Sequence, residues 1–128
     1  MKRSRRNQKG TVLVEMAIVL PLFILILIGT MEFGIVLHDY QILQNASREG
    51  ARFGTIGNSA ASIEARVRSF APQLTQGLVV QVTGDGGERG AELTVRATYP
   101  VPLVTALLRE IVGANAFQLR AESHMRLE

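Results

Sequence analysis

The hydrophobic pattern begins with an almost unbroken apolar run over residues 11–31, which follows a basic head and carries a single charge, Glu15. About 20 consecutive apolar residues are enough for a helix to cross the hydrocarbon core of a bilayer. A helix that is apolar all round can also form the core of a large soluble protein. A chain of 128 residues offers too little structure to bury it on every side, so the run predicts a membrane-spanning helix.

The same run raises a second alternative, a secretory signal peptide that is removed. Such a peptide has an apolar region of roughly 7–15 residues, followed by a cleavage site of small residues. Here the run is longer, and GTMEFG at residues 29–34 has no small-x-small site, so we expect the helix to stay in the protein. Pro21 predicts a kink or local melting near residues 17–21, because proline removes a helical hydrogen bond.

A stripe of apolar and small residues continues at helical spacing beyond the run. Its members are Phe33, Val36, Leu37, Tyr40, Leu43, Ser47, Gly50, Ala51 and Gly54. The stripe predicts one helix from Thr11 to Arg52, about 63 Å long at 1.5 Å per residue. We expect close packing at Gly50 and an end of the helix between Gly54 and Gly57, so that residues 32–57 form a helical extension and linker.

The rest of the chain, residues 58–128, predicts a small α+β domain. A helical pattern covers residues 59–71. Strand-like runs at 78–83 and 91–99 flank the glycine-rich hairpin loop GDGGERG, and clean alternation over 117–128 predicts a third strand. We expect a three-stranded antiparallel sheet with helices on one face.

The apolar positions of this domain predict which side chains are buried. Phe70 lies on the apolar face of the helix over 59–71, and Phe117 lies on the apolar face of the last strand. After the two prolines of YPVP, the residues around Leu103, Ile111 and Val112 predict a short helix that is amphipathic or largely buried. A helix on the membrane surface is also possible there, although the segment has no basic face.

Charge is distributed unevenly along the chain. Five of the 14 basic residues precede Gly10, and from Thr11 onward nine basic residues stand against 11 acidic ones. A basic head before a membrane span keeps the N-terminus in the cytoplasm, which places the C-terminal part on the exported side. A folded surface that binds nucleic acid would need basic residues spread over one face, so we expect no nucleic-acid partner.

Candidate chemistry is sparse. The chain has no cysteine, which excludes disulfides and thiolate chemistry, and His38 and His124 lack metal-ligand spacing. Asp85 and Glu88 in the hairpin loop are too few for a calcium shell. No nucleophile–base pair or phosphate loop is visible, so we expect a protein that is not an enzyme and that binds no cofactor or metal.

Glu15 is the exception, because an ionisable group within a membrane segment is costly and is a functional candidate by default. It can extend toward the membrane surface and favour the positive N-terminal end of its helix. If the chain is cut after Gly10, Glu15 can instead pair with the new amine of Thr11. Position alone does not decide between these two roles.

An ordered set of features over about residues 9–54 resembles the TadE-like family of pseudopilins from tight-adherence (Flp) pilus systems. The set is a basic leader (residues 1–10), Gly10, Glu15, Pro21, the Glu-x-Gly of Glu32 and Gly34, and an A-x-R-E-x-A-R ending that contains Arg48, Glu49, Gly50, Ala51 and Arg52. Major Flp pilins carry Glu-Tyr where this chain has Glu15-Met16. That difference favours a minor pilin or pseudopilin, and relatives of TadG share the same features.

The resemblance implies cleavage after Gly10 by a prepilin peptidase and pairing of Glu15 with the Thr11 amine of a neighbouring chain. It implies a pilin-like architecture, with a single pass through the bacterial inner membrane and an exported domain. The implied partners are other pilins or pseudopilins and the pilus assembly machinery. The alternative is an uncleaved single-pass anchor whose exported domain binds a component of the cell envelope.

Overall fold

The computed structural model describes residues 5–128, with side chains described for 10–106 and 109–128. Residues 1–4 of the predicted basic leader lie outside this range. The chain divides into two compact units, one up to Gly34 (unit 1) and the other from Ile35 to Glu128 (unit 2). A long apolar helix is followed by short helices and a three-stranded antiparallel sheet, which confirms the predicted α+β class.

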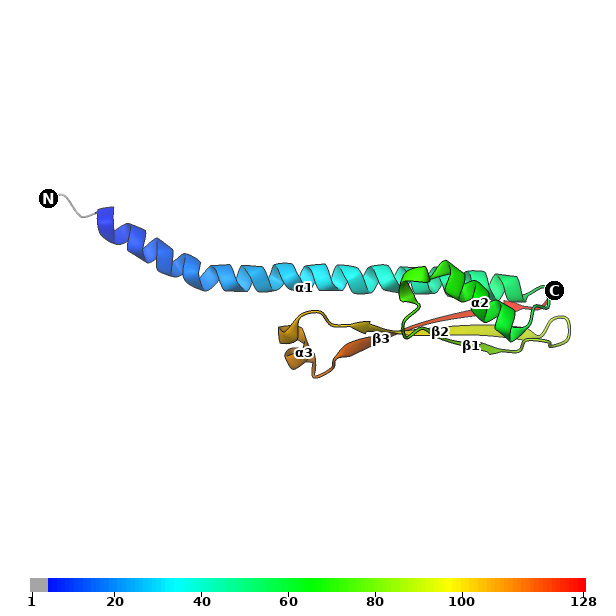
Figure 1. Ribbon diagram of the computed structural model, residues 1–128. Coiled ribbons are helices and arrows are strands. Elements are labelled where there is room, and N and C mark those ends of the chain that lie inside the picture. The colour runs from blue at the N-terminus through cyan, green and yellow to red at the C-terminus, as the bar shows by residue number, and fades with distance from the viewer. Residues whose placement is uncertain (1–4) are drawn as a thin grey trace. The chain divides into compact units, whose positions relative to one another are not determined.

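The first helix, α1, covers Arg5–Gly54 and is longer at both ends than the predicted Thr11 to Arg52. Its helical conformation is unbroken at Pro21, so of the predicted kink or local melting, the melting is absent. The ribbon curves within its blue N-terminal part (Figure 1). The helix ends at Gly54, and Gly57 follows with φ of 83°. That left-handed conformation suits glycine and belongs to the turn that follows the helix.

The sheet consists of β1 (Val79–Thr83), β2 (Glu92–Pro102) and β3 (Ala116–Arg126), in the order β1-β2-β3. The hairpin loop joins β1 to β2, as predicted, and α3 (Ala106–Val112) lies between β2 and β3. Strand β2 runs past its predicted end at residue 99 through two prolines. It can do so because β1 pairs only as far as Thr98, so Pro100 and Pro102 lie where β2 has β3 as its one neighbour.

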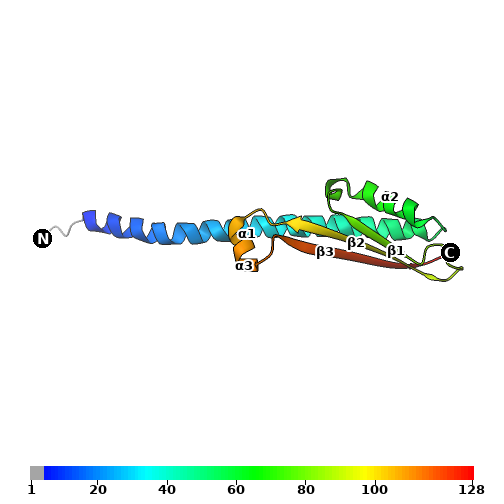
Figure 2. The same cartoon turned by 60° about the horizontal axis from the view of Figure 1, so that its bottom comes forward.

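One face of the sheet is covered by the second half of α1 and by α2 (Ala60–Phe70), as Figures 1 and 2 show together. A short 3-10 turn, Pro72–Leu74, follows α2. Leu93, Val95 and Ala97 alternate inward along β2 and belong to the same buried cluster as Leu43, Ala46, Ala51, Ile63, Val67, Ala71, Leu74, Leu78, Ala121 and Leu127. The core of unit 2 is therefore formed between the two helices and this face.

Several apolar side chains that the pattern predicted as buried are exposed. Phe70 is 45% exposed, and its ring lies 4.9 Å from the guanidinium carbon of Arg66, which covers it in part. Phe117, Ile111 and Val112 are 42%, 67% and 42% exposed, although Leu103 beside them is buried. Phe117 pairs with Val101 beyond Val79, the first residue of β1, where the sheet has narrowed to two strands.

Candidate functional site

The predicted processing site lies on an exposed part of α1. Gly10, Thr11 and Glu15 are all helical and exposed. Thr11 and Glu15 are four residues apart, which places their side chains on one face, one helical turn from each other. A carboxylate and an amine created at Thr11 would therefore lie within reach of each other.

Packing among the described residues does not explain why positions 10 and 34 are glycine. A Cβ atom added to Gly10 or Gly34 would meet no described atom within 4 Å. Glycine inside a helix costs about 1 kcal/mol relative to alanine. The folded chain alone would therefore be more stable with alanine at both positions.

Glu32, the other half of the Glu-x-Gly motif, differs from these residues in its burial. Glu32 is only 7% exposed, whereas Gly34, two positions later, is exposed. Burial of a carboxylate is costly unless polar contacts compensate for it. The two motif glutamates therefore differ in exposure, since Glu15 is exposed.

The end of the motif serves the packing of unit 2. Ala51 is fully buried, and a Cβ atom on Gly50 would overlap with Cγ2 of Val67 in α2. The space at Gly50 is therefore as tight as close packing there would need. Gly54, predicted only as a helix end, is equally tight, because a Cβ atom there would overlap with Cδ2 of Leu93.

The charged residues of the same motif divide between two roles. The Oε1 atom of Glu49 accepts a hydrogen bond from Nη2 of Arg66 at 3.2 Å, which links α1 to α2, and its Oε2 atom lies 3.7 Å from Nε of Arg52. Arg48 is exposed and lines a shallow hollow with Tyr40, Gln41, Gln44 and Asn45 of α1. Glu49 thus has a structural contact inside the chain, and Arg48 is directed to the surface.

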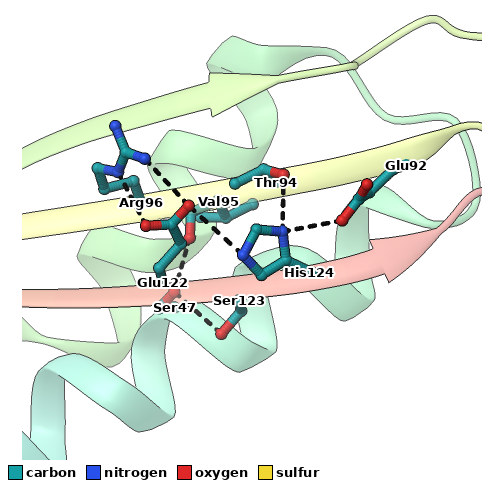
Figure 3. A network of polar contacts seen from close by, with 8 residues as sticks. All are labelled: Ser47, Glu92, Thr94, Val95, Arg96, Glu122, Ser123 and His124. Carbon is teal, nitrogen blue, oxygen red and sulfur yellow. Dashed lines mark hydrogen bonds and ion pairs between the residues drawn. The ribbon is translucent and has the colours of Figure 1, made fainter.

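A polar contact that the sequence did not indicate joins α1 to the sheet. The fully buried Ser47 donates to the carbonyl oxygen of Val95 at 3.0 Å, and its hydroxyl lies 3.1 Å from that of Ser123 (Figure 3). A hydroxyl has one proton and two acceptor positions, so Ser123 can donate in return. The stripe placed Ser47 inward, but its partner in β3 is 76 residues away.

The opposite face of the sheet carries a row of charged and polar side chains (Figure 3). Arg96 donates to Glu122 through Nε and Nη2, at 3.1 and 3.0 Å. These hydrogen bonds and the charge of Arg96 hold the pKa of Glu122 below its ordinary value and raise the pKa of Arg96. His124 lies between two carboxylates, with Nδ1 3.0 Å from Glu92 Oε1 and Nε2 3.4 Å from Glu122 Oε1.

The hairpin loop has a capping role that the sequence analysis missed. Oδ2 of Asp85 accepts a hydrogen bond at 3.0 Å from the backbone N–H of Ala60, the first residue of α2. A carboxylate at the N-terminal end of a helix is stabilising. Asn58 and Ser59, the predicted caps, make other contacts: Asn58 donates to the carbonyl oxygen of Phe53, and Ser59 lies 3.0 Å from the hydroxyl of Ser62.

Among the described residues, no group of three or more Asp, Glu or His side chains is arranged to hold a metal ion. The carboxylates around His124 form pairs along a flat strand surface, so they do not enclose a central point. The remaining candidates for function are therefore the exposed motif residues of unit 1 and the apolar surface of α1.

These observations define a class of protein in which one helix, long and apolar enough to cross a membrane, leads into a small α+β unit. An 18-residue stretch in the apolar part of α1 has a mean hydropathy of 2.8, and none of its residues is buried. A single-pass membrane anchor is the arrangement that this helix suggests.

Residues 10–52 match the family described as TadE-like protein. The matched segment is about a third of the chain and lies entirely within α1. It confirms the resemblance found in the motifs and suggests a component related to the Tad pilus. No curated protein and no solved structure matches the chain.

Proposed function

We propose that this protein is a pseudopilin or minor pilin-like structural component in the assembly of a Tad (Flp) pilus or a related secretion filament. It is anchored by α1 in the inner membrane, with unit 2 on the exported side, and it acts without catalysis. The observation that carries the proposal is the TadE-like match over residues 10–52, which begins at the glycine of the proposed processing site.

In this proposal a prepilin peptidase cleaves the chain after Gly10. The fold does not require the exposed glycine or the exposed carboxylate in this apolar segment. In the proposal Gly10 is used in the cleavage and Glu15 is used in the processed chain. Gly10 lies within a helix, so the peptidase must unwind a short stretch there before it can cut. Glycine makes this easier, because it is a weak helix former.

Glu15 then receives the new N-terminus of Thr11, either in its own chain or in a neighbouring subunit. The pairing neutralises both charges near the membrane surface, where an isolated charge is costly. Because Met16 follows Glu15, where major pilins have tyrosine, we assign the chain to a minor or accessory position. Its partners are then the prepilin peptidase, other pilins or pseudopilins and the assembly machinery.

Cleavage is tested by co-expression of the full chain with a prepilin peptidase of a Tad system and by measurement of the N-terminal sequence and mass. For the wild type we expect a cleaved chain that starts at Thr11. For Gly10→Ala we expect no cleaved chain. The matched control is Gly34→Ala, a second exposed glycine that should not affect cleavage. Full processing of Gly10→Ala, or a chain that keeps its basic head, would overturn the assignment of the site.

Glu15→Gln separates assembly from cleavage. We expect this variant to be cut like the wild type but to be recovered less with its partner subunits after crosslinking in the membrane. An uncleaved anchor whose unit 2 binds an envelope component is the alternative, since α1 is helical through Gly10. That alternative predicts an intact N-terminus and full tolerance of Glu15→Gln.

A further inference from the structure

Unit 2 has a cluster of exposed apolar side chains around α3. Val104, Ile111, Val112 and Phe117 are 70%, 67%, 42% and 42% exposed, and we call these four residues the apolar end patch. Ile111 and Val112 belong to α3, Val104 to the segment between β2 and α3, and Phe117 to the start of β3. Exposed apolar surface concentrated in this way marks a contact with a partner or with a membrane.

The backbone holds the segments that carry the patch together. Pro102, the last residue of β2, pairs with Ala116, the first residue of β3. Just beyond this pair, the N–H of Leu103 donates to the carbonyl oxygen of Asn115 at 3.1 Å. The loop that contains α3 is therefore closed at its base. Val104 follows this contact on the loop side, and Phe117 lies on the sheet side, where it pairs with Val101.

Arg109, the basic residue of α3, points back to this base. Its Nε atom donates to the carbonyl oxygen of Leu103 at 2.8 Å, and its Nη2 atom donates to that of Val104 at 3.1 Å. The guanidinium is therefore held by the loop's own carbonyl groups. Glu110 is exposed beside Ile111 and Val112, and its carboxylate is left to face water at the edge of the patch.

The position of the patch along α1 follows from the packing of unit 2. The sheet runs beside the second half of α1 (Figures 1 and 2), and Ser47 is bonded to Ser123. From Ser123 to Phe117 the strand covers about 20 Å, which corresponds to about 13 helical residues from Ser47 toward the start of unit 2. Phe117, on the sheet side of the patch, thus lies near the first residues of unit 2, which begins at Ile35.

The same end of unit 2 is apolar on α1 as well. Ile35 and Leu37 are 48% and 46% exposed. The chain that leaves this end through Gly34 is the apolar helix of unit 1. At the opposite end of unit 2 lies the polar and glycine-rich hairpin loop. Ile56, an exposed aliphatic residue, lies in the turn that follows α1.

We infer that the apolar end patch is inserted into the surface of the bilayer that anchors α1. This inference rests on the proposed membrane anchoring. A bilayer interface accepts aliphatic and aromatic side chains without a complementary shape. The patch needs no basic face, because α1 already holds the protein at the membrane. A specific protein interface buries about 800 Å² per partner, more than four partly covered side chains provide.

The experiment uses the full chain in lipid vesicles, since its lack of cysteine allows one labelled site at a time. Ile111→Cys reports on the patch, Ile56→Cys is the matched exposed isoleucine at the far end, and Ile24→Cys lies in the apolar run. Each variant carries the same fluorophore. Quenching by brominated lipid measures contact with acyl chains, and quenching by iodide measures contact with water.

We expect brominated lipid to quench the labels at positions 24 and 111 several-fold more than the label at position 56, and iodide to show the reverse order. Quenching at position 24 but not at 111 would overturn the inference and leave the anchoring intact. A lack of lipid quenching at position 24 would overturn both. A label at position 111 that is shielded from both quenchers is covered by protein, which also overturns the inference.

Discussion

The two halves of α1 form one continuous helix, and the TadE-like match covers most of both. The residues of the two halves are nevertheless subject to different structural constraints. In the half that belongs to unit 2, Gly50 and Gly54 are glycine because α2 and β2 leave no space for a Cβ atom. In the half that belongs to unit 1, Gly10 and Gly34 have open space around them, and Glu15 is exposed. A shared sequence motif can therefore combine residues that the fold requires with residues that only a peptidase, a membrane or a partner requires.

The largest expected effect tests this difference with one substitution in each half. Gly50→Ala should destabilise unit 2 by about 1–3 kcal/mol, because Val67 is β-branched and has little freedom to move away. Gly34→Ala should be neutral or stabilise by up to about 1 kcal/mol. Thermal denaturation of the full chain in detergent, followed by circular dichroism, measures both. Equal effects of the two substitutions would contradict the division of α1.

A middle-sized effect compares two hydroxyl groups on α1. Ser47→Ala should cost about 1–2 kcal/mol in the same assay, because Val95 and Ser123 lose a buried hydrogen-bond partner. In the other half, Thr30 donates at 2.8 Å to Ile26 of its own helix and is exposed. Thr30→Ala should stay within about 0.5 kcal/mol. A loss at Thr30 as large as that at Ser47 would mean that the first half also depends on contacts of this kind.

The smallest effect concerns the sheet face that α1 does not cover. Arg96 lowers the pKa of Glu122 in the folded chain. The resulting stabilisation is present above the ordinary carboxyl pKa of about 4.3 and is lost as the pH falls through the lowered pKa. Glu122→Gln should therefore show a slightly weaker loss of melting temperature between about pH 5 and pH 3 than the wild type. An identical acid dependence would show that solvent screens the pair completely.

The sequence predicted the elements of unit 2 well because each has a strong local signal. The alternation of Leu93, Val95 and Ala97 placed the inner face of β2 correctly, and the glycines after β1 marked the hairpin. Gly50 was identified as a packing position from its place on the stripe. These features depend on residues close together in the chain, where period and turn chemistry are visible.

What the sequence did not predict depends on distant contacts. Strand β2 passes through Pro100 because β1 is too short to pair there, which the residues of β2 cannot reveal. Asp85 caps α2 across 25 residues, and Ser47 meets Ser123 across 76. Phe70 and Phe117 follow the apolar period, but they lie where the neighbouring elements have ended or where Arg66 gives partial cover. Of the predicted site, residues 49–52 have contacts in the fold and Arg48 lies at the surface, whereas the roles of Gly10 and Glu15 stay predictions.

The lengthwise packing of α1 on the sheet has a mechanical consequence. Contacts run from Leu43 through Gly54 on one side and along β2 and β3 on the other, bridged by the hydrogen bond of Ser47. A pull along the axis of this half of the helix would act on all of these contacts at once, in shear. The helix would have to slide past the whole row before unit 2 opened, whereas a sideways pull would break the contacts one after another. Unit 2 should therefore resist tension along α1 better than tension across it.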